Sequence, residues 1–245
     1  ICGDVVIDVP ASSQVHRQVV RKDLDMGPIV VDPMFALYFV TTAIPHLGDS
    51  DSAADALANA DVEQHGVARP NIAASALSQV HRAAEQGSAG ATIAVRLAGV
   101  IGGPSEIVAA WPNYVGAAFG VAIDIGSTTV AGHLCDVFSG DVLASAGVMN
   151  PQIRFGEDLM SRVSYVMMNK GGDKDLTRAI RVAVNDLIDE LVDKAGVSRD
   201  RVLEVVMVGN PIMHHIFLGI DPTPLGGAPF VLATDRAVVG PATSL

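Results

Sequence analysis

The sequence is poor in aromatic residues, in positive charge and in long hydrophobic runs. Aromatic side chains make up 4% of its 245 residues, so aliphatic residues must supply most of the core, which fits α/β layers better than a β-sandwich. It has 16 Lys and Arg against 27 Asp and Glu, and this negative balance argues against a nucleic-acid or anionic-membrane surface. No uncharged apolar run reaches the ~18 residues that a membrane-spanning helix needs.

Cysteine is scarce as well. Cys2 and Cys135 are the two cysteines of the chain, too few and too far apart for a disulfide framework, a structural zinc site or an iron–sulfur cluster. Such sparse use of cysteine is typical of a reducing compartment. We therefore expect a cytoplasmic protein.

The residues that are abundant predict a folded chain of more than one part. Hydrophobic residues make up 49% of the chain and charged residues 18%, a composition that can bury a core. We predict a linker arm of extended segments over 1–31, a small α+β middle domain over 32–115 and a larger unit over 116–245. Because the chain opens on Ile1 without Met and stops at Leu245 with no closing element, we expect it to be a piece of a longer protein.

Apolar spacing predicts the elements of both units. The middle domain should contain two helices, starting at Ala53 and Ile72, and a pair of strands over 92–97 and 106–111. The larger unit should open with a three-strand meander and continue with helices around one further strand. Its predicted elements are strands over 119–124, 128–136 and 142–148, helices over 157–168 and 175–195, a strand over 202–208 and a helical segment over 212–218.

The end of the predicted strand at 119–124 carries the most informative motif. An apolar strand delivers Asp124, and Gly126, Ser127, Thr128 and Thr129 follow at once. Backbone N–H groups and hydroxyls of such a turn can bind phosphate oxygens, and the carboxylate can hold a hydrated Mg²⁺ or orient an attacking water. The same residues also suit an ordinary hairpin in which Asp124 caps its own turn.

A second turn, at Gly209 and Asn210, follows the predicted strand at 202–208. Glycine there lets another group approach the backbone, and the N-terminus of the following helical segment attracts anions. This turn is either part of the same nucleotide site or a tight connection between a strand and a helix.

Charged side chains gather around the start of the predicted helix at 157–168. We favour capping and pairing at a spacing of four residues for Glu157 and Arg162. Arg154 and Asp158 are candidates for the nucleotide cleft or for a partner surface.

Two other groups of residues are expected to be structural. His214 and His215 are adjacent, so on a helix they project about 100° apart and are poorly placed to share a metal ion. The methionines are expected to fill the core; they are Met160, Met167, Met168, Met207 and Met213.

The order of strand, phosphate turn, two further strands and helix resembles the opening of the actin-like ATPase superfamily. Three longer stretches, 120–129, 150–162 and 208–219, resemble the reductive activators of corrinoid proteins, and residues 6–10 and 29–33 are similar to the linker and middle domain of that family. The resemblance implies an α/β fold in which 116–245 form the first lobe of an actin-like, ribonuclease-H-like ATPase domain with a mixed sheet.

The resemblance also implies a function. A member of this family uses ATP to return the Co(II) corrinoid of a methyltransferase or corrinoid protein to Co(I), with an electron from a 2Fe-2S domain that would lie outside this chain. ATP and Mg²⁺ would bind at Asp124, through water for the metal, at the turn that follows it, and at Gly209 and Asn210. The catalytic residue would be Asp124.

The expected partner is a corrinoid protein or corrinoid-dependent methyltransferase, and the expected assembly is a homodimer without nucleic acid or membrane. This fragment alone is expected to be inactive. A non-catalytic docking and dimerisation scaffold and a small-molecule kinase of the same superfamily remain alternatives.

Overall fold

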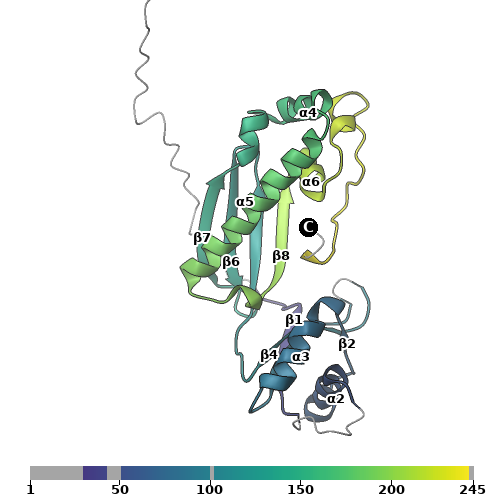
Figure 1. Cartoon of the computed structure of the whole chain (residues 1–245), viewed down its shortest axis with the longest axis vertical. Coiled ribbons are helices and arrows are strands. Elements are labelled where there is room, and N and C mark those ends of the chain that lie inside the picture. The colour runs from purple at the N-terminus through teal and green to yellow at the C-terminus, as the bar shows by residue number, and fades with distance from the viewer. Residues whose placement is uncertain (1–29, 43–50, 100–101, 243–245) are drawn as a thin grey trace, which may run out of the picture.

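The computed structural model describes residues 30–42, 51–99 and 102–242. The predicted linker arm therefore lies almost entirely outside the described residues. The described part forms two α/β units, one below the other in Figure 1, each with its own sheet and its own core. Within these residues no helix is both long enough and apolar enough to cross a membrane.

The smaller unit contains a four-stranded mixed sheet in the order β1-β3-β4-β2. The two-residue strand β2 runs parallel to β4, and the other pairs are antiparallel. Its elements are β1 (Phe35–Val40), α2 (Ala53–His65), β2 (Asn71–Ile72), the 3₁₀ turn η1 (Ala74–Ala76), α3 (Leu77–Gln86), β3 (Ala91–Arg96) and β4 (Glu106–Pro112). The helix expected at Ala53 begins there because Ser52 caps it, accepting a hydrogen bond from the Asp55 N–H at 3.1 Å.

The sequence interpretation missed one strand of this unit. It predicted a strand pair, whereas β1 pairs antiparallel with β3 over its whole length, from Phe35 opposite Arg96 to Val40 opposite Ala91. The segment Phe-Ala-Leu-Tyr-Phe-Val is apolar throughout, and only its two end residues are fully buried. It therefore lacks the alternation that marks a half-buried strand.

The larger unit has a four-stranded sheet in the order β7-β6-β5-β8. The predicted meander is confirmed, and β8 returns through two helices to lie parallel to β5. Its elements are β5 (Phe119–Ile125), β6 (Thr129–Asp136), β7 (Val142–Met149), η2 (Pro151–Phe155), α4 (Leu159–Met168), α5 (Gly172–Ala195), η3 (Arg199–Arg201), β8 (Val202–Gly209), α6 (Pro211–Leu218) and η4 (Thr223–Gly226). This mixed sheet confirms the predicted α/β class.

Helix α5 covers one face of this sheet (Figure 1). It packs on β6 and β7, and its buried apolar stripe belongs to one core cluster with inward side chains of β5, β6 and β7. Gly132 of β6 lets the helix approach closely, because an added Cβ would lie 3.1 Å from side-chain atoms of both Leu187 and Leu191. On the opposite face of β5, Ala122 and Asp124 are exposed.

Three helix starts and three methionines depart from the sequence interpretation. Helix α5 begins at Gly172, three residues before the predicted start. Helix α3 begins at Leu77 because the residues expected in its first turn instead form β2 and η1. Helix α4 begins at Leu159 because the residue before it is the cap. The prediction that methionines fill the core is wrong for Met160, Met167 and Met168, which are 47%, 64% and 77% exposed.

The two units touch at the end of β4. The indole Nε1 of Trp111 donates a hydrogen bond to a carboxylate oxygen of Asp200 at 3.1 Å. Leu203 of β8 packs against the buried cluster that contains Trp111. The exact domain boundaries at 31 and 115 stay a prediction.

Candidate functional site

The predicted phosphate turn lies between β5 and β6, at the end of the central strand pair of the larger unit. Asp124 is exposed on the face of β5 that α5 does not cover, opposite Ala131 of β6 and Val208 of β8. The turn is closed by the Gly126 N–H, which donates to the Thr129 carbonyl oxygen at 2.9 Å. The hairpin therefore places one carboxylate beside a tight turn of hydroxyl residues.

Three successive backbone carbonyl groups of this turn accept hydrogen bonds from buried residues on its inner side. The Asn150 side chain donates from Nδ2 to the Gly126 oxygen at 2.8 Å, and its backbone N–H donates to the Thr128 oxygen at 2.8 Å. Between them, Nη2 of Arg162 donates to the Ser127 oxygen. The side chains of Asn150 and Arg162 are fully buried.

This bracing fixes the direction of the backbone N–H groups. In a trans peptide the C=O and the following N–H point to opposite sides, so the N–H groups of Ser127 and Thr128 point away from Asn150 and Arg162. Within the described residues neither N–H donates a hydrogen bond. Two adjacent, unused donors beside three hydroxyl side chains form the kind of backbone concavity that binds anions.

The second predicted turn lies next to the first. Gly209 pairs with Ile125 in the parallel register, so Asn210 follows beside Gly126. Asn210 caps α6 by accepting a hydrogen bond from the Met213 N–H at 3.0 Å. The structure thus brings both predicted turns to one edge of the sheet.

Among the described residues, no hydrogen bond or ion pair joins Arg154 or Asp158 to the phosphate turn. Arg154 is exposed and its guanidinium lies 4.6 Å from the centre of the Phe155 ring. Asp158 caps α4 by accepting from the Ser161 N–H at 2.7 Å, and hydrogen bonds from Ser161 hold the pKa of this carboxyl below its ordinary value.

Three functional candidates were missed or misplaced by the sequence interpretation. Arg162 was expected to pair with Asp158 four residues earlier; the Asp158 charge does act on it, but the Arg162 side chain is fully buried behind the phosphate turn and donates to the Ser127 oxygen instead. Asn150 and Gln152 are also fully buried, and Gln152 donates from Nε2 to the Leu176 oxygen at 3.0 Å. A polar Asn-Pro-Gln run between two apolar elements was the available signal, but it equally suits an exposed loop.

The expected structural role of the histidine pair is supported at His215. This side chain is buried, its Nδ1 lies 2.7 Å from the Pro211 oxygen, and its Nε2 accepts from the Ala233 N–H at 3.0 Å.

Metal ligands are scarce elsewhere in the described residues. They contain no cluster of three or more His, Cys, Asp or Glu that could hold a metal ion. Burial raises the pKa of the Cys135 thiol. One such thiol cannot supply the four ligands of a 2Fe-2S cluster, so the described residues do not fit that group.

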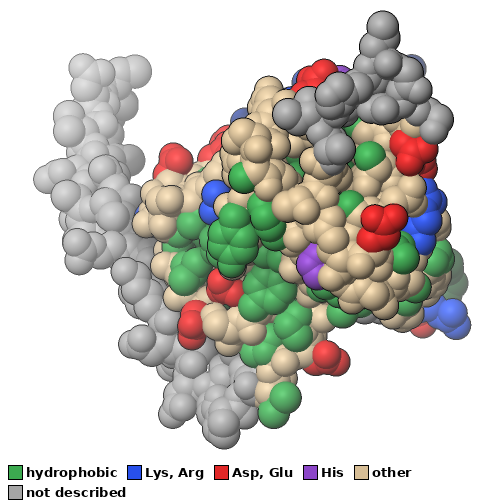
Figure 2. All heavy atoms as spheres, turned by 90° about the horizontal axis from the view of Figure 1, so that it is seen from below, with side chains coloured by type: hydrophobic (Ala, Val, Ile, Leu, Met, Phe, Trp, Pro, Cys, Tyr) green, Lys and Arg blue, Asp and Glu red, His purple; other side chains and the backbone are tan. Residues whose placement is uncertain are grey.

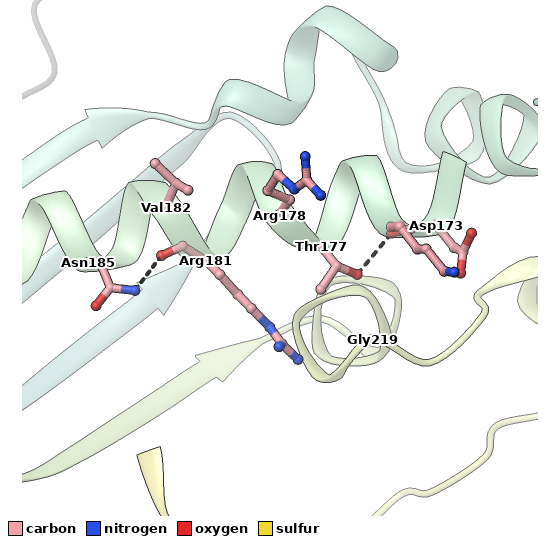
Figure 3. A pocket seen from close by; sticks show the side chains of 8 residues that line it. Asp173, Thr177, Arg178, Arg181, Val182, Asn185 and Gly219 are labelled. Carbon is pink, nitrogen blue, oxygen red and sulfur yellow. Dashed lines mark hydrogen bonds between the residues drawn. The ribbon is translucent and has the colours of Figure 1, made fainter. Parts of the chain in front are cut away.

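A groove of about 410 Å³ lies away from the phosphate turn, along the outer face of α5 (Figure 3). Several of its polar groups are already engaged: Thr177 donates to the Asp173 oxygen at 2.8 Å, and Asn185 to the Arg181 oxygen at 3.0 Å. Arg181 reaches towards α6 and donates to the Phe217 oxygen at 2.9 Å. The groove holds none of the predicted site residues.

Comparison with known proteins places the chain in a family. Residues 119–245 match the family model described as the RACo middle region. The corrinoid activation enzyme RamQ of Eubacterium limosum is 35% identical over 113 residues, which are 46% of this chain and 19% of that protein. A solved structure named reductive activator for corrinoid, iron-sulfur protein is 28% identical, with a TM-score of 0.64 over 88% of this chain and 33% of its own.

The chain therefore spans about a third or less of the relatives that it matches. The family model, by contrast, matches more than half of this chain, including both turns of the candidate site. The chain belongs to the RACo middle region family.

Proposed function

We propose that the chain is part of an ATP-dependent reductive activator. The intact protein would return the Co(II) corrinoid of a methyltransferase or corrinoid protein to Co(I), with one electron from a 2Fe-2S domain outside this chain. The names of the relatives, corrinoid activation enzyme and reductive activator, support the general role. The phosphate turn supports the dependence on ATP.

The observation that carries the proposal is the pair of unused N–H groups at Ser127 and Thr128. Their carbonyl partners are turned inward by Asn150 and Arg162, so these donors are fixed before any ligand arrives. A pre-organised donor pair costs little to order when an anion binds. An ordinary hairpin has no need for such bracing from buried polar side chains.

Each residue of the turn has a role in the proposed site. Backbone N–H groups of the turn and the hydroxyls of Ser127, Thr128 and Thr129 bind phosphate oxygens, and Gly126 keeps the turn tight. Asp124 is exposed and its carboxylate offers two oxygen atoms, so it fits the water shell of a hydrated Mg²⁺. The same carboxylate would orient the water that attacks the phosphate. The bound Mg²⁺-nucleotide supplies the phosphoryl group whose cleavage drives the cycle.

The neighbouring residues complete one side of the cleft. Gly209 lets β8 lie close to Ile125, because an added Cβ would be 3.2 Å from the Ile125 oxygen, and Asn210 caps the N-terminus of α6 at the same end of the sheet. That N-terminus favours negative charge. Arg154 and Asp158, both exposed, are proposed to contact the cleft or the corrinoid partner.

A homodimer is proposed for the intact protein. Strand β1 is at the edge of the smaller sheet, with no strand on its outer side among the residues described. Figure 2 shows hydrophobic side chains near the centre of the lower face, among several acidic ones. An open strand edge and an exposed apolar patch are features that pairing between copies covers.

The decisive test compares Asp124→Asn with Asp186→Asn in the intact protein. Asp186 is an exposed aspartate of α5, so the control makes the same change of charge away from the turn. We expect Asp124→Asn to lower both ATP turnover and Co(I) formation, the latter followed by corrinoid absorption, by at least about 100-fold, and Asp186→Asn to change neither. Unaltered rates in Asp124→Asn would reject the catalytic assignment.

The same assays separate the alternatives. A docking and dimerisation scaffold would support activation without ATP turnover. A small-molecule kinase would transfer phosphate to an added acceptor and would not depend on a corrinoid protein.

A further inference from the structure

Arg162 is a buried cation without an anionic partner in direct contact. Its side chain is fully buried, and the guanidinium donates to four neutral acceptors, which are three oxygen atoms and the Met213 sulfur at 3.4 Å from Nη1. Nε donates to the Gly156 oxygen at 2.9 Å, Nη1 to Oε1 of Gln152 at 3.3 Å, and Nη2 to the Ser127 oxygen. None of the ion pairs found among the described residues includes it.

The charge that acts on Arg162 is the Asp158 carboxylate, which is poorly placed to neutralise the guanidinium. Asp158 lies four residues earlier, but it is exposed and its carboxylate is engaged by the Ser161 N–H at 2.7 Å. Burial lowers the pKa of the guanidinium, although an arginine stays protonated in proteins. A buried charge without a close counter-ion is costly to the fold, so stability alone does not account for this residue.

The peptide group between Ser127 and Thr128 lies directly in front of the guanidinium. Its carbonyl oxygen accepts from Arg162, and its N–H points to the opposite side, where no described group accepts it. A hydrogen bond to the carbonyl end of a peptide polarises its N–H and makes it a stronger donor. The positive charge of Arg162 therefore acts on the outer side of the turn through one peptide group.

The rest of the bracing network holds the guanidinium in this position. The Oε1 atom of Gln152 accepts from Arg162 while its Nε2 donates to the Leu176 oxygen of α5. The Gln152 N–H in turn donates to Oδ1 of Asn150 at 2.9 Å. Asn150 is neutral, so of the two side chains that brace the turn carbonyls only Arg162 carries charge.

We propose that Arg162 is a positioning residue. Its positive charge is balanced by the polyphosphate of a bound nucleotide, and the Ser127–Thr128 peptide group lies between the two charges and transmits their interaction. This inference rests on the proposed function, and it names what gives the turn its selectivity. Arg162 never touches the ligand; it favours a phosphate-bearing nucleotide over the bare nucleoside. The hydroxyls of the turn would bind either a phosphate or water, whereas the buried charge favours only the anion.

The test is a calorimetric titration of the intact protein with ATP·Mg and, separately, with adenosine. The variants are Arg162→Gln, which removes the charge, and Arg162→Lys, which keeps the charge but loses the fork of donors. Arg178→Gln is the matched control, because Arg178 is an exposed cation of α5 whose loss changes net charge equally. We expect Arg162→Gln to weaken ATP·Mg binding by about tenfold or more, Arg162→Lys to recover part of the loss, and Arg178→Gln to have no effect.

Adenosine separates positioning from simple damage to the fold. A collapsed turn or a distorted lobe would weaken both ligands, whereas the loss of charge behind the turn should weaken ATP·Mg and leave adenosine unchanged. Equal affinity of wild type and Arg162→Gln for ATP·Mg would overturn the inference while leaving the proposed function intact. Absence of ATP·Mg binding in the wild type would overturn both.

Should Arg162→Gln not fold, Arg162→Lys carries the test. The lysine ammonium keeps the buried positive charge. It is shorter than the guanidinium and lacks its forked donors, so it can replace the interaction with the peptide only in part. A selective loss for ATP·Mg, with adenosine binding kept, supports the inference. Unchanged or equal losses for both ligands contradict it.

Discussion

Removing the Asn150 side chain should destabilise the larger unit by a predictable amount. Its Nδ2 donates to the Gly126 oxygen at 2.8 Å, and its Oδ1 accepts from the Gln152 N–H at 2.9 Å, in a side chain that is fully buried. In Asn150→Ala both partners lose their hydrogen bond, and each buried group left unpaired costs about 1–3 kcal/mol. We expect a total loss of about 2–4 kcal/mol, since water can reach part of the turn.

The matched control is Asn169→Ala. Asn169 also donates from Nδ2 to a backbone carbonyl, that of Tyr165 at 2.9 Å, but it is exposed at the end of α4. Water can replace it there, so the cost should be about 0.5 kcal/mol or less. In urea unfolding followed by circular dichroism, Asn150→Ala should lower the midpoint by about 1–2 M for a slope near 2 kcal/mol/M. Equal shifts in the two variants would refute the bracing role of Asn150.

Three further predictions follow from packing and burial. Leu187→Ala, which opens a cavity between α5 and Gly132, should cost about 2–5 kcal/mol in urea unfolding, whereas Val182→Ala on the exposed side of the same helix should cost little. Burial raises the pKa of the Asp61 carboxyl above 3.8, so the native state binds that proton more tightly than the unfolded chain does. Stability should therefore fall as the pH rises from about 4 through the raised pKa. In thermal unfolding, Asp61→Asn should remove this fall. Gly126→Ala should weaken ATP·Mg binding in a calorimetric titration, because the new Cβ would lie 2.7 Å from the Thr129 oxygen, whereas Gly227→Ala meets no atom within 4 Å and should bind normally.

The sequence predicted the larger unit well because its patterns are local. Alternation in β5 and the 3.6-residue spacing in α5 reflect one buried face each, and both elements lie where expected. Strand β1 escaped prediction because its partner β3 lies more than fifty residues away and its own residues show no alternation. Because the distant strand β3 determines which residues of β1 are buried, the sequence of β1 shows no periodic pattern.

The candidate site was predicted only in part, for a similar reason. The turn residues from Asp124 to Thr129 are contiguous, so their chemistry can be recognised in the sequence. The residues that hold the turn are the cap of η2 and a residue of α4, and their carbonyl partners are backbone atoms, which no side-chain pattern reveals. Arg162 in particular follows Asp158 at the spacing of a surface pair, and only the fold shows that it points inward.

Amide hydrogen exchange at Ser127 and Thr128 tests most directly whether this turn binds phosphate. Both N–H groups lack an acceptor within the described residues, so they should exchange fast in the free intact protein. Saturating ATP·Mg should slow exchange at these two amides, and adenosine should not. Exchange that is equally fast with and without ATP·Mg, under conditions in which the nucleotide is bound, would contradict the account.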